Sequence, residues 1–428
     1  MTISAALIHR PLAAITVLLL CLLSVTAQAQ QSPTATQDPK GVDYRSEPQG
    51  LLIEPEIIER IVIFGDRHFG NGELRHGFYV DVWNMIPGAG WIAGGPGYRQ
   101  WYNKDQLFVD ASTSISWRGY KTAQARVELP RLMRSRLALG SQVRWQDFTQ
   151  VSFFGEGPDS FDSNLTEYRL KSSNLVGYAT FRPVESVDID ARIGWLKPSV
   201  LPRAGAFMRD HPDTQDLFPT NIVYAVGEQP TFIHSEAAVT ADTRDYPGHP
   251  TRGGLVRGAV GHYSDRDSGL FSFRRYEAEG AGFVPLADSR VVLALRGWLV
   301  TSDTNDGQFV PFYLQPSLGG HNSLRGYEDY RFHDRNLLLL NAEARIALMT
   351  HVDLAAFMDA GSVASRVGDL DLSKRSYGAG LRLHSRRQTF ARIDVARSDE
   401  GWRLVLRLTE PLNLARTSRR TAAVPFVP

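Results

Sequence analysis

The chain has 428 residues, and its 47 Lys and Arg residues almost balance its 46 Asp and Glu residues. This balance argues against a nucleic-acid-binding protein, which would carry an excess of basic residues. Cys21 is the only cysteine, so the chain cannot form an intrachain disulfide.

The first 29 residues have the pattern of a cleaved export signal. His9 and Arg10 give a positively charged start, residues 12–25 are apolar, and Ala27-Gln28-Ala29 is a small-x-small cleavage site. The alternative is an uncleaved N-terminal membrane anchor, but the apolar run is short for a membrane span. We therefore predict a signal peptide over residues 1–29.

Residues 30–77 are predicted to form a short periplasmic segment ahead of the main domain. Residues 30 to about 50 are rich in Gln, Ser, Thr, Pro and Asp, which is typical of a flexible leader. Residues 51–64 could form one short helix or a strand. A segment of this length without cysteines is small for an independent domain.

From residue 78 onward, apolar and polar side chains alternate. In residues 109–118 the odd positions carry Val, Ala, Thr, Ile and Trp, whereas the even positions carry Asp, Ser and Arg. Such alternation predicts strands with one dry face and one polar face. A soluble all-β protein would alternate in the same way.

Three features favour a transmembrane β-barrel over that soluble alternative. The predicted strands are near the 9–11 residues that a tilted membrane span needs. The polar faces carry full charges and small residues, which suits a wet lumen. Aromatic residues recur at the ends of the apolar faces, as in the girdles of such barrels, at Trp117, Trp145, Trp195, Trp298 and Trp402.

Sixteen segments show the strand pattern, an even number as in single-chain bacterial barrels. They are 78–86, 90–101, 106–118, 121–129, 135–147, 166–182, 186–197, 230–242, 253–264, 272–284, 289–301, 336–348, 351–361, 376–385, 389–398 and 401–410. With odd strands running outward, the long connections 148–165, 198–229 and 302–335 lie on the extracellular side. The predicted barrel covers residues 78–410, and a flexible tail covers residues 411–428.

The stretch from Gly319 to Asn336 is too long for a tight hairpin and too polar for a buried core. Such a long connection in a strand-rich chain is usually functional or disordered. Disorder fits poorly, because Leu324, Tyr327 and other large side chains would gain from burial. We therefore expect the loop to fold back into a cavity with Arg325 at its tip, where the buried guanidinium needs a carboxylate.

Four stretches in this order resemble motifs of the BamA/TamA family of outer-membrane barrels, the bacterial surface antigen superfamily. Gly319 through Leu324-Arg325-Gly326-Tyr327 resembles the sixth-loop motif of that family. Leu340 to Arg345 and the Phe357-x-Asp359-x-Gly361 pattern look like the two strands that follow it. Asp242 to Gly254 is similar to a turn before the middle strands of the family.

The resemblance implies an all-β, 16-stranded antiparallel barrel whose long sixth loop enters the lumen and whose tip arginine meets the carboxylate of the Phe-x-Asp-x-Gly strand. Carried over, this pairs Arg325 with Asp359. The alternation agrees, because Asp359 and Glu343 both fall on predicted inner faces. The predicted contact between loop and lumen comprises Arg325, Gly326, Tyr327, Asp359, Phe357, Gly361 and Glu343, with Arg382, Arg392 and Asp394 also facing inward.

The chain departs from the family pattern in two places. BamA-like members carry periplasmic POTRA domains of roughly 75 residues each, and the segment before residue 78 cannot supply one. Family barrels usually end at the last strand, whereas this chain continues to Pro428. Partner docking through POTRA domains is therefore not expected from this segment.

The resemblance implies a barrel that inserts or translocates proteins or lipids at the bacterial outer membrane, and the alternative is a passive channel. Its expected partners are outer-membrane lipids, client outer-membrane proteins and a separate periplasmic protein, with no nucleic acid. An enzyme is not expected, because His321-Asn322-Ser323 are neighbours that rarely converge as a triad. We expect no cofactor and no metal.

Overall fold

The computed structural model describes residues 50–69, 76–82, 88–89, 93–204, 211–218, 223–225, 228–287 and 289–408. The predicted signal peptide, the polar leader up to residue 49 and the C-terminal tail lie outside these residues. Among the residues that the structure describes, no helix is both long and apolar enough to cross a membrane.

The predicted all-β fold is confirmed, because sixteen strands form one antiparallel sheet in which consecutive strands are neighbours. The strands are β1 Gly77–Val82, β2 Ala93–Tyr102, β3 Leu107–Ser116, β4 Lys121–Arg131, β5 Leu137–Phe153, β6 Thr166–Val184, β7 Val187–Pro202, β8 Phe232–Asp242, β9 Gly253–Asp265, β10 Phe273–Leu286, β11 Val291–Asp303, β14 Asn336–Met349, β15 Val352–Ala364, β16 Lys374–His384, β17 Thr389–Ser398 and β18 Gly401–Arg407. Each corresponds to one predicted segment.

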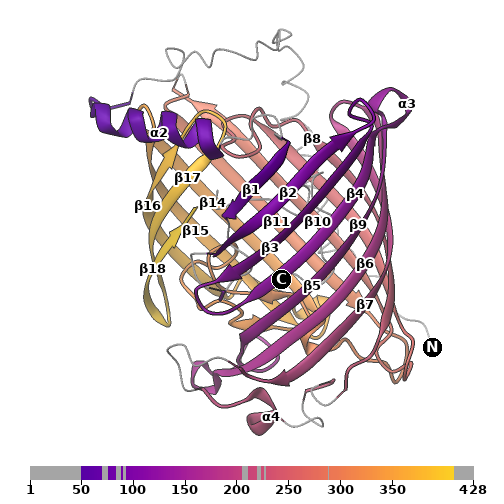
Figure 1. The fold of residues 1–428 in the computed structure, drawn as a ribbon. Coiled ribbons are helices and arrows are strands. Elements are labelled where there is room, and N and C mark those ends of the chain that lie inside the picture. Colours follow the sequence, from indigo (N-terminus) through magenta and orange to yellow (C-terminus); the bar gives the residue numbers. More distant parts are fainter. Residues whose placement is uncertain are drawn as a thin grey trace, which may run out of the picture.

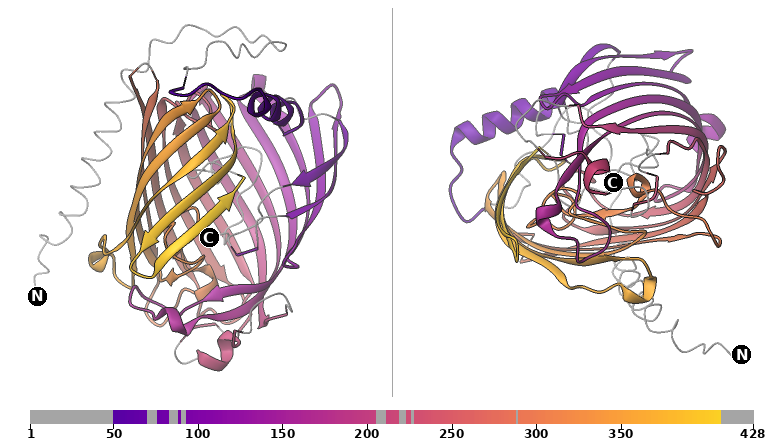
Figure 2. Two further views of the ribbon diagram at one scale, coloured as in Figure 1. Left: turned by 90° about the vertical axis from the view of Figure 1, so that its left-hand side faces the viewer. Right: turned by 90° about the horizontal axis from the view of Figure 1, so that it is seen from below.

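The sheet curls around a central axis, so that β1 and β18 become its two edges (Figures 1 and 2). Each edge strand pairs with one neighbour, β2 or β17, and the ladders of the described residues include none between β1 and β18. We call this boundary the seam. Within the residues that the structure describes, β1 spans 6 residues and β18 spans 7.

The connections separate into two ends of the barrel. The long connections 154–165, 203–231 and 304–335 lie at the long-loop end, together with α4 (Thr214–Leu217). Short turns, α2 (Glu56–Phe69) and α3 (Leu132–Ser135) lie at the opposite, short-turn end (Figure 1). Since β5, β7 and β11 run on to Phe153, Pro202 and Asp303, all three long connections are shorter than predicted.

Residues 51–64, for which helix and strand were both open, contribute to helix α2. The segment before the helix is fixed to the barrel at the turn between β14 and β15. Leu51 N–H donates to Ala347 O at 3.2 Å, and Glu54 contacts His351 Nδ1 at 2.6 Å. Ile57, Ile61 and Phe64 of the helix remain exposed.

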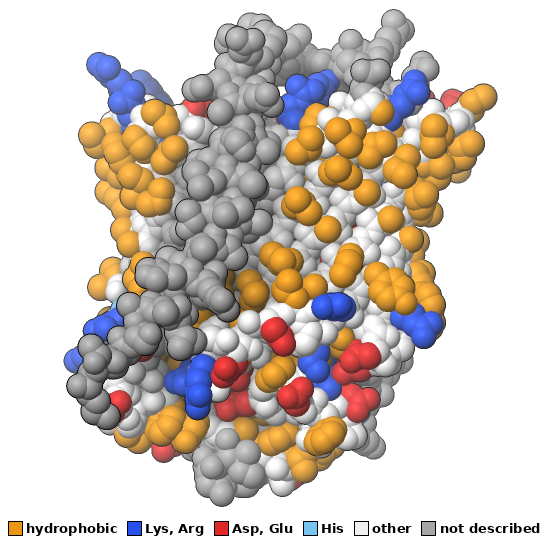
Figure 3. Space-filling view, turned by 180° about the vertical axis from the view of Figure 1, so that it is seen from behind, with side chains coloured by type: hydrophobic (Ala, Val, Ile, Leu, Met, Phe, Trp, Pro, Cys, Tyr) orange, Lys and Arg blue, Asp and Glu red, His pale blue; other side chains and the backbone are white. Residues whose placement is uncertain are grey.

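The alternation of side chains gives the sheet an apolar outer face. In β15, for example, Leu354 and Met358 are exposed, whereas Asp353, Phe357 and Asp359 are buried on the inner face. Figure 3 shows apolar side chains over the middle and upper part of one side, with acidic and basic side chains gathered toward the long-loop end. This distribution suits a band of lipid around the barrel.

One predicted girdle residue is on the wrong face. Trp117, Trp145, Trp195 and Trp402 are exposed on the outside as expected. Trp298 is buried, because it shares the inner face of β11 with Arg296, and its Nε1–H donates to Glu277 at 2.9 Å. The prediction treated Trp298 as the end of an apolar face and overlooked this parity.

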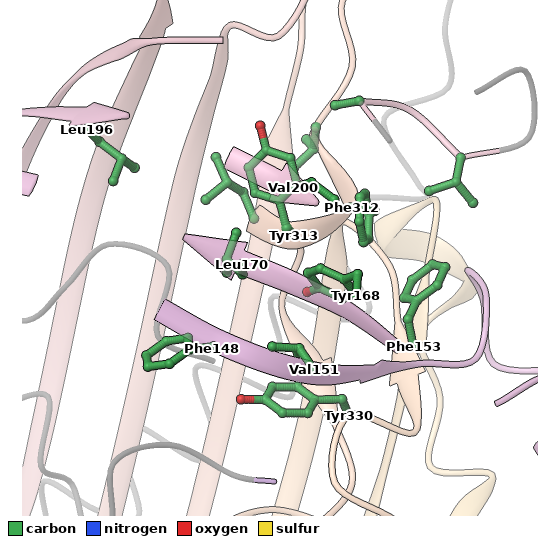
Figure 4. Packing of buried hydrophobic residues seen from close by; sticks show 14 of the residues in the cluster. Phe148, Val151, Phe153, Tyr168, Leu170, Leu196, Val200, Phe312, Tyr313 and Tyr330 are labelled. Carbon is green, nitrogen blue, oxygen red and sulfur yellow. The ribbon is translucent and has the colours of Figure 1, made fainter. Parts of the chain in front are cut away.

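Two apolar clusters fill the interior at the long-loop end. The larger one joins the inward ends of β5 to β7 with the start of the 304–335 connection. Figure 4 shows Phe153 and Tyr168 beside Phe312 and Tyr313, with Tyr330 beneath Val151. The smaller cluster includes Trp298, Leu318, Leu324, Tyr327 and Phe332, and it seats the loop against β11, β14 and β15.

Candidate functional site: the inserted loop and its contacts

The 304–335 connection is ordered by a hairpin of its own that the sequence did not predict. The short strands β12 (Ser317–Leu318) and β13 (Phe332–His333) pair with each other. Gly319 and Gly320 follow β12 with φ angles of +117° and +82°, which favour glycine. Gly320 N–H then donates to Tyr327 O at 3.1 Å, so the loop tip is a compact turn around Arg325.

Arg325 and Asp359 are bonded by backbone and side chain together. Arg325 donates to Asp359 from its backbone N–H at 3.1 Å, from Nε at 2.9 Å and from Nη2 at 2.7 Å. Its remaining Nη1 donates to Glu343 at 2.5 Å, and its guanidinium carbon lies 3.5 Å from the centre of the Phe357 ring. The guanidinium is therefore held by two carboxylates and one aromatic face.

The ionic contacts continue from Glu343 around the inner wall and return to the loop. Arg382 of β16 donates to Glu343 at 3.1 Å and also to Asp394 of β17. Arg392 donates to Asp394 at 3.1 Å and to the His321 carbonyl at 2.7 Å. The loop is thus connected to strands β14, β15, β16 and β17 by one continuous set of charges.

These charges are buried, so their pairing decides their energetics. Arg325 is 2% exposed and Asp359 is fully buried. Burial alone would lower the pKa of Arg325, but Asp359 and Glu343 outweigh it and raise that pKa above its usual value. A buried group of this kind is costly when its partner is removed, because an uncompensated charge remains.

Two hydrogen bonds orient the Asp359 carboxylate toward the loop. Asn341 Nδ2 donates to Asp359 at 2.8 Å and to the Ser323 carbonyl at 2.9 Å. Ser376 Oγ donates to the other carboxylate oxygen of Asp359 at 3.2 Å. The role of Asn341 as a link between the loop and this carboxylate was not predicted from the sequence.

The remaining predicted residues lie in the same site. Gly326 packs so closely that a Cβ there would stand 2.7 Å from Ser376 Cβ. Its carbonyl accepts from Ser398 Oγ at 2.9 Å, and the Tyr327 hydroxyl donates to Asp399 at 2.6 Å. Gly361 lies where a Cβ would meet the Leu338 carbonyl at 2.4 Å, so strand β14 passes directly against it.

Comparison with known proteins gives the family of the chain. Residues 109–398, more than half of the chain, match the model of the Omp85 superfamily domain. The chain belongs to the Omp85 superfamily. As an Omp85 barrel, it is an outer-membrane protein of bacteria, as the localisation prediction expected.

Solved structures are similar to this chain at low sequence identity. BamA from Haemophilus ducreyi lacking POTRA domains 1–3 is 15% identical, with a TM-score of 0.58 over 78% of this chain and 70% of that chain. CdiB from Escherichia coli is 13% identical, with a TM-score of 0.49 over 77% of this chain and 61% of that chain. A search of curated proteins gave no significant match.

The loop of this Omp85 barrel also contacts β18 and the connection between β1 and β2, which the sequence analysis missed. Asp329 accepts from the backbone N–H of Gly88, beyond β1, at 2.8 Å, and lies 3.7 Å from Arg407 Nη2 of β18. Glu328 accepts from Arg403 of β18 at 2.9 Å. No sequence motif predicts a partner for Glu328 or Asp329. Their position directly after Arg325-Gly326-Tyr327 could have marked them as candidate contact residues.

A cavity of about 260 Å³ lies between the loop and the last strand. Its lining comes from Gly320, His321, Tyr327 and Asp329 on one side and from residues 403–407 of β18 on the other. The loop therefore contacts the inner side of β18 through separated polar links and leaves space between them.

Proposed function

We propose that this Omp85 barrel inserts or translocates proteins or lipids at the outer membrane through its seam. The observation that carries the proposal is the pair of edges β1 and β18, which have no ladder between them among the described residues. Edge strands present unpaired backbone groups that can pair with another chain. An incoming strand of a client protein could add to such an edge by β-augmentation.

The loop would act as a structural element rather than as a catalyst. Through Arg325 it is fixed to β15, and through Glu328 and Asp329 it reaches β18 and the backbone beyond β1. The bonds to β15 are buried, whereas those to β18 are partly exposed and border a cavity. We infer that the loop holds β15, three strands from β18, firmly and the seam weakly, so that the seam can open.

The proposed partners are client outer-membrane proteins, outer-membrane lipids and a separate periplasmic protein. Exposed apolar side chains cover the outside of the strands on both sides of the seam, including Val80 of β1 and Leu404 of β18. A transferred strand or lipid would leave the seam directly into this apolar band.

Crosslinking of the seam tests the proposal. Cysteines at Val80 and Leu404, in a chain carrying Cys21→Ser, would be joined by bis-maleimide linkers of increasing length. Both side chains point outward, with 72% and 73% exposure. The short linker is expected to abolish insertion of a client barrel into proteoliposomes, and the longest linker to restore it in part.

A matched control joins two strands that are already paired. Val395 and Leu404 lie opposite each other in the β17–β18 ladder, so a crosslink there leaves the seam untouched. Full activity of the protein locked between Val80 and Leu404 would overturn seam opening. Steady, large single-channel currents from the same protein would then favour a passive pore.

A further inference from the structure

Helix α2 exposes a row of apolar side chains at the short-turn end. Ile57, Ile61 and Phe64 lie on successive turns of the helix, and their exposed fractions are 66%, 51% and 56%. Apolar side chains gain free energy by leaving water, so a row of them on one side of a helix points to a contact surface. We call these three residues the apolar stripe.

The other sides of the helix have different surroundings. Val62 is fully buried, and Gly65 lies so close to the barrel that a Cβ there would stand 2.9 Å from the Phe390 ring of β17. Glu56 and Arg60 form an exposed ion pair at 2.6 Å. Successive residues are rotated by about 100° around a helix, so the apolar stripe lies between the side that packs on the barrel and the polar side.

Helix α2 lies outside the ring of strands, at the short-turn rim and next to the seam (Figures 1 and 2). The chain enters the helix from the turn between β14 and β15, where Leu52 N–H donates to Leu348 O at 2.8 Å. The helix then passes Phe390 of β17, and the next strand along the chain is β1. A right-handed helix that runs in this direction, with Gly65 against the barrel, turns its apolar stripe toward the lipid-facing wall and its polar side away from it.

The apolar outer face of the barrel continues to this rim. Leu381 of β16, Ile393 of β17 and Leu406 of β18 lie opposite one another in neighbouring ladders, and all three are exposed. Ile393 follows Phe390 on the same strand, nearer the middle of the barrel. The lipid band of this outer-membrane protein therefore borders the helix.

We propose that α2 is an interfacial helix whose apolar stripe binds the membrane leaflet at the short-turn end, beside the seam. Its partner is the boundary between phospholipid headgroups and acyl chains, where such helices bury one apolar side and keep a polar side in water. The exposed pair of Glu56 and Arg60 fits that polar side. The helix would then anchor the chain ahead of β1 to the membrane. This anchor requires no opening of the seam, so the proposal is independent of the proposed function.

A spin label at Ile61→Cys tests the membrane contact. The full chain carries Cys21→Ser and is reconstituted into vesicles of phosphatidylethanolamine and phosphatidylglycerol. Collisions of the label with oxygen, which concentrates among acyl chains, are compared with collisions with a water-soluble nickel chelate. The Ile61 label is expected to meet mainly oxygen, at a depth of about 5–10 Å below the headgroup boundary. Ile57→Cys, one turn away, is expected to give the same result.

Glu59→Cys is the matched control, because Glu59 is an exposed residue on the polar side of the same helix. Its label is expected to meet mainly the nickel chelate. All three variants are required to keep the heat-dependent gel mobility of the wild type, which shows that the barrel is folded.

Three results would overturn the proposal. Equal collision ratios at Ile61 and Glu59 would place the apolar stripe in water. Low access of both reagents to the Ile61 label would mean that protein covers the stripe. Spectral broadening that disappears on dilution with unlabelled chain would identify that protein as a second copy.

Discussion

Arg325 donates three hydrogen bonds to Asp359, one from its backbone and two from its guanidinium, across 34 positions of sequence. Both residues are buried. Because the backbone and the side chain of Arg325 share one acceptor, Asp359 fixes the position of the loop tip and also neutralises the charge of the arginine. The contact holds the loop in the lumen of a barrel whose own edges are unpaired among the described residues.

Replacing Arg325 with Ala is expected to destabilise the barrel by about 3–5 kcal/mol, because Asp359 and Glu343 remain buried without their cation. Asp359→Asn in the same chain should recover part of this loss by removing one uncompensated charge. Samples are incubated at increasing temperatures and run on a gel without boiling. The measurement is the incubation temperature at which the folded, fast-migrating form is lost. Arg266→Ala, which removes an exposed arginine at the long-loop end, is the control. A wild-type transition for Arg325→Ala would refute the bracing role.

Gly326→Ala is expected to displace the loop tip without changing any charge. The added Cβ would stand 2.7 Å from Ser376 Cβ and 3.0 Å from the Arg397 backbone carbon, and these strands cannot both retreat. We expect a loss of about 1–3 kcal/mol from overpacking, seen in the same gel transition. Gly258→Ala is the matched control, since a Cβ there meets nothing within 4 Å. Equal transition temperatures for Gly326→Ala and Gly258→Ala would mean that the loop tip accommodates the added Cβ without loss of stability.

The sequence predicted the strands because alternation is a local property that each strand displays alone. It also placed Asp359 and Glu343 on inner faces, since parity within a strand needs no knowledge of the fold. The prediction for Trp298 was wrong because this parity was overlooked: Trp298 shares the inner face with Arg296, whereas its apolar neighbours suggested a membrane girdle.

Contacts across the lumen could not be predicted, because no local pattern records them. Asp329 meets Gly88 from 241 positions away, and His249 meets His384 only because the connection between β8 and β9 folds toward β16. The partner of Arg325 could be predicted because the sequence resembles the motifs of a known family. Those of Asp329 and His249 required the three-dimensional arrangement.

Asp329→Ala is expected to loosen β18. The change removes the acceptor of Gly88 N–H and the carboxylate beside Arg407. A lost bond of this kind costs about 1–3 kcal/mol, which corresponds to about 5-fold to 150-fold faster hydrogen exchange where local opening controls it. The measurement is amide exchange in residues 401–407. Asp369→Ala, at an exposed position of the same end, should leave that exchange unchanged. A wild-type exchange rate in Asp329→Ala would show that this contact of the loop does not stabilise β18.

Glu156 is expected to make the long-loop end less stable as the pH rises. Burial raises the pKa of Glu156 from 4.5 to about 7, although the hydrogen bond from Gln315 at 2.6 Å opposes this. Since the pKa in the folded state is the higher one, the contribution is complete below about pH 4.5. It is lost as the pH rises through about 7, by about 3 kcal/mol in total.

Glu156→Gln should remove this pH dependence, because an amide stays neutral and can still pair with Gln315. The unfolding temperature of the wild type is expected to fall between pH 5 and pH 8.5, and that of Glu156→Gln to stay nearly level and exceed it at pH 8.5. Asp159→Asn changes a 94% exposed carboxylate in the same connection and should follow the wild type. A parallel fall in Glu156→Gln would show that another group titrates and that Glu156 does not cause the pH dependence of this end.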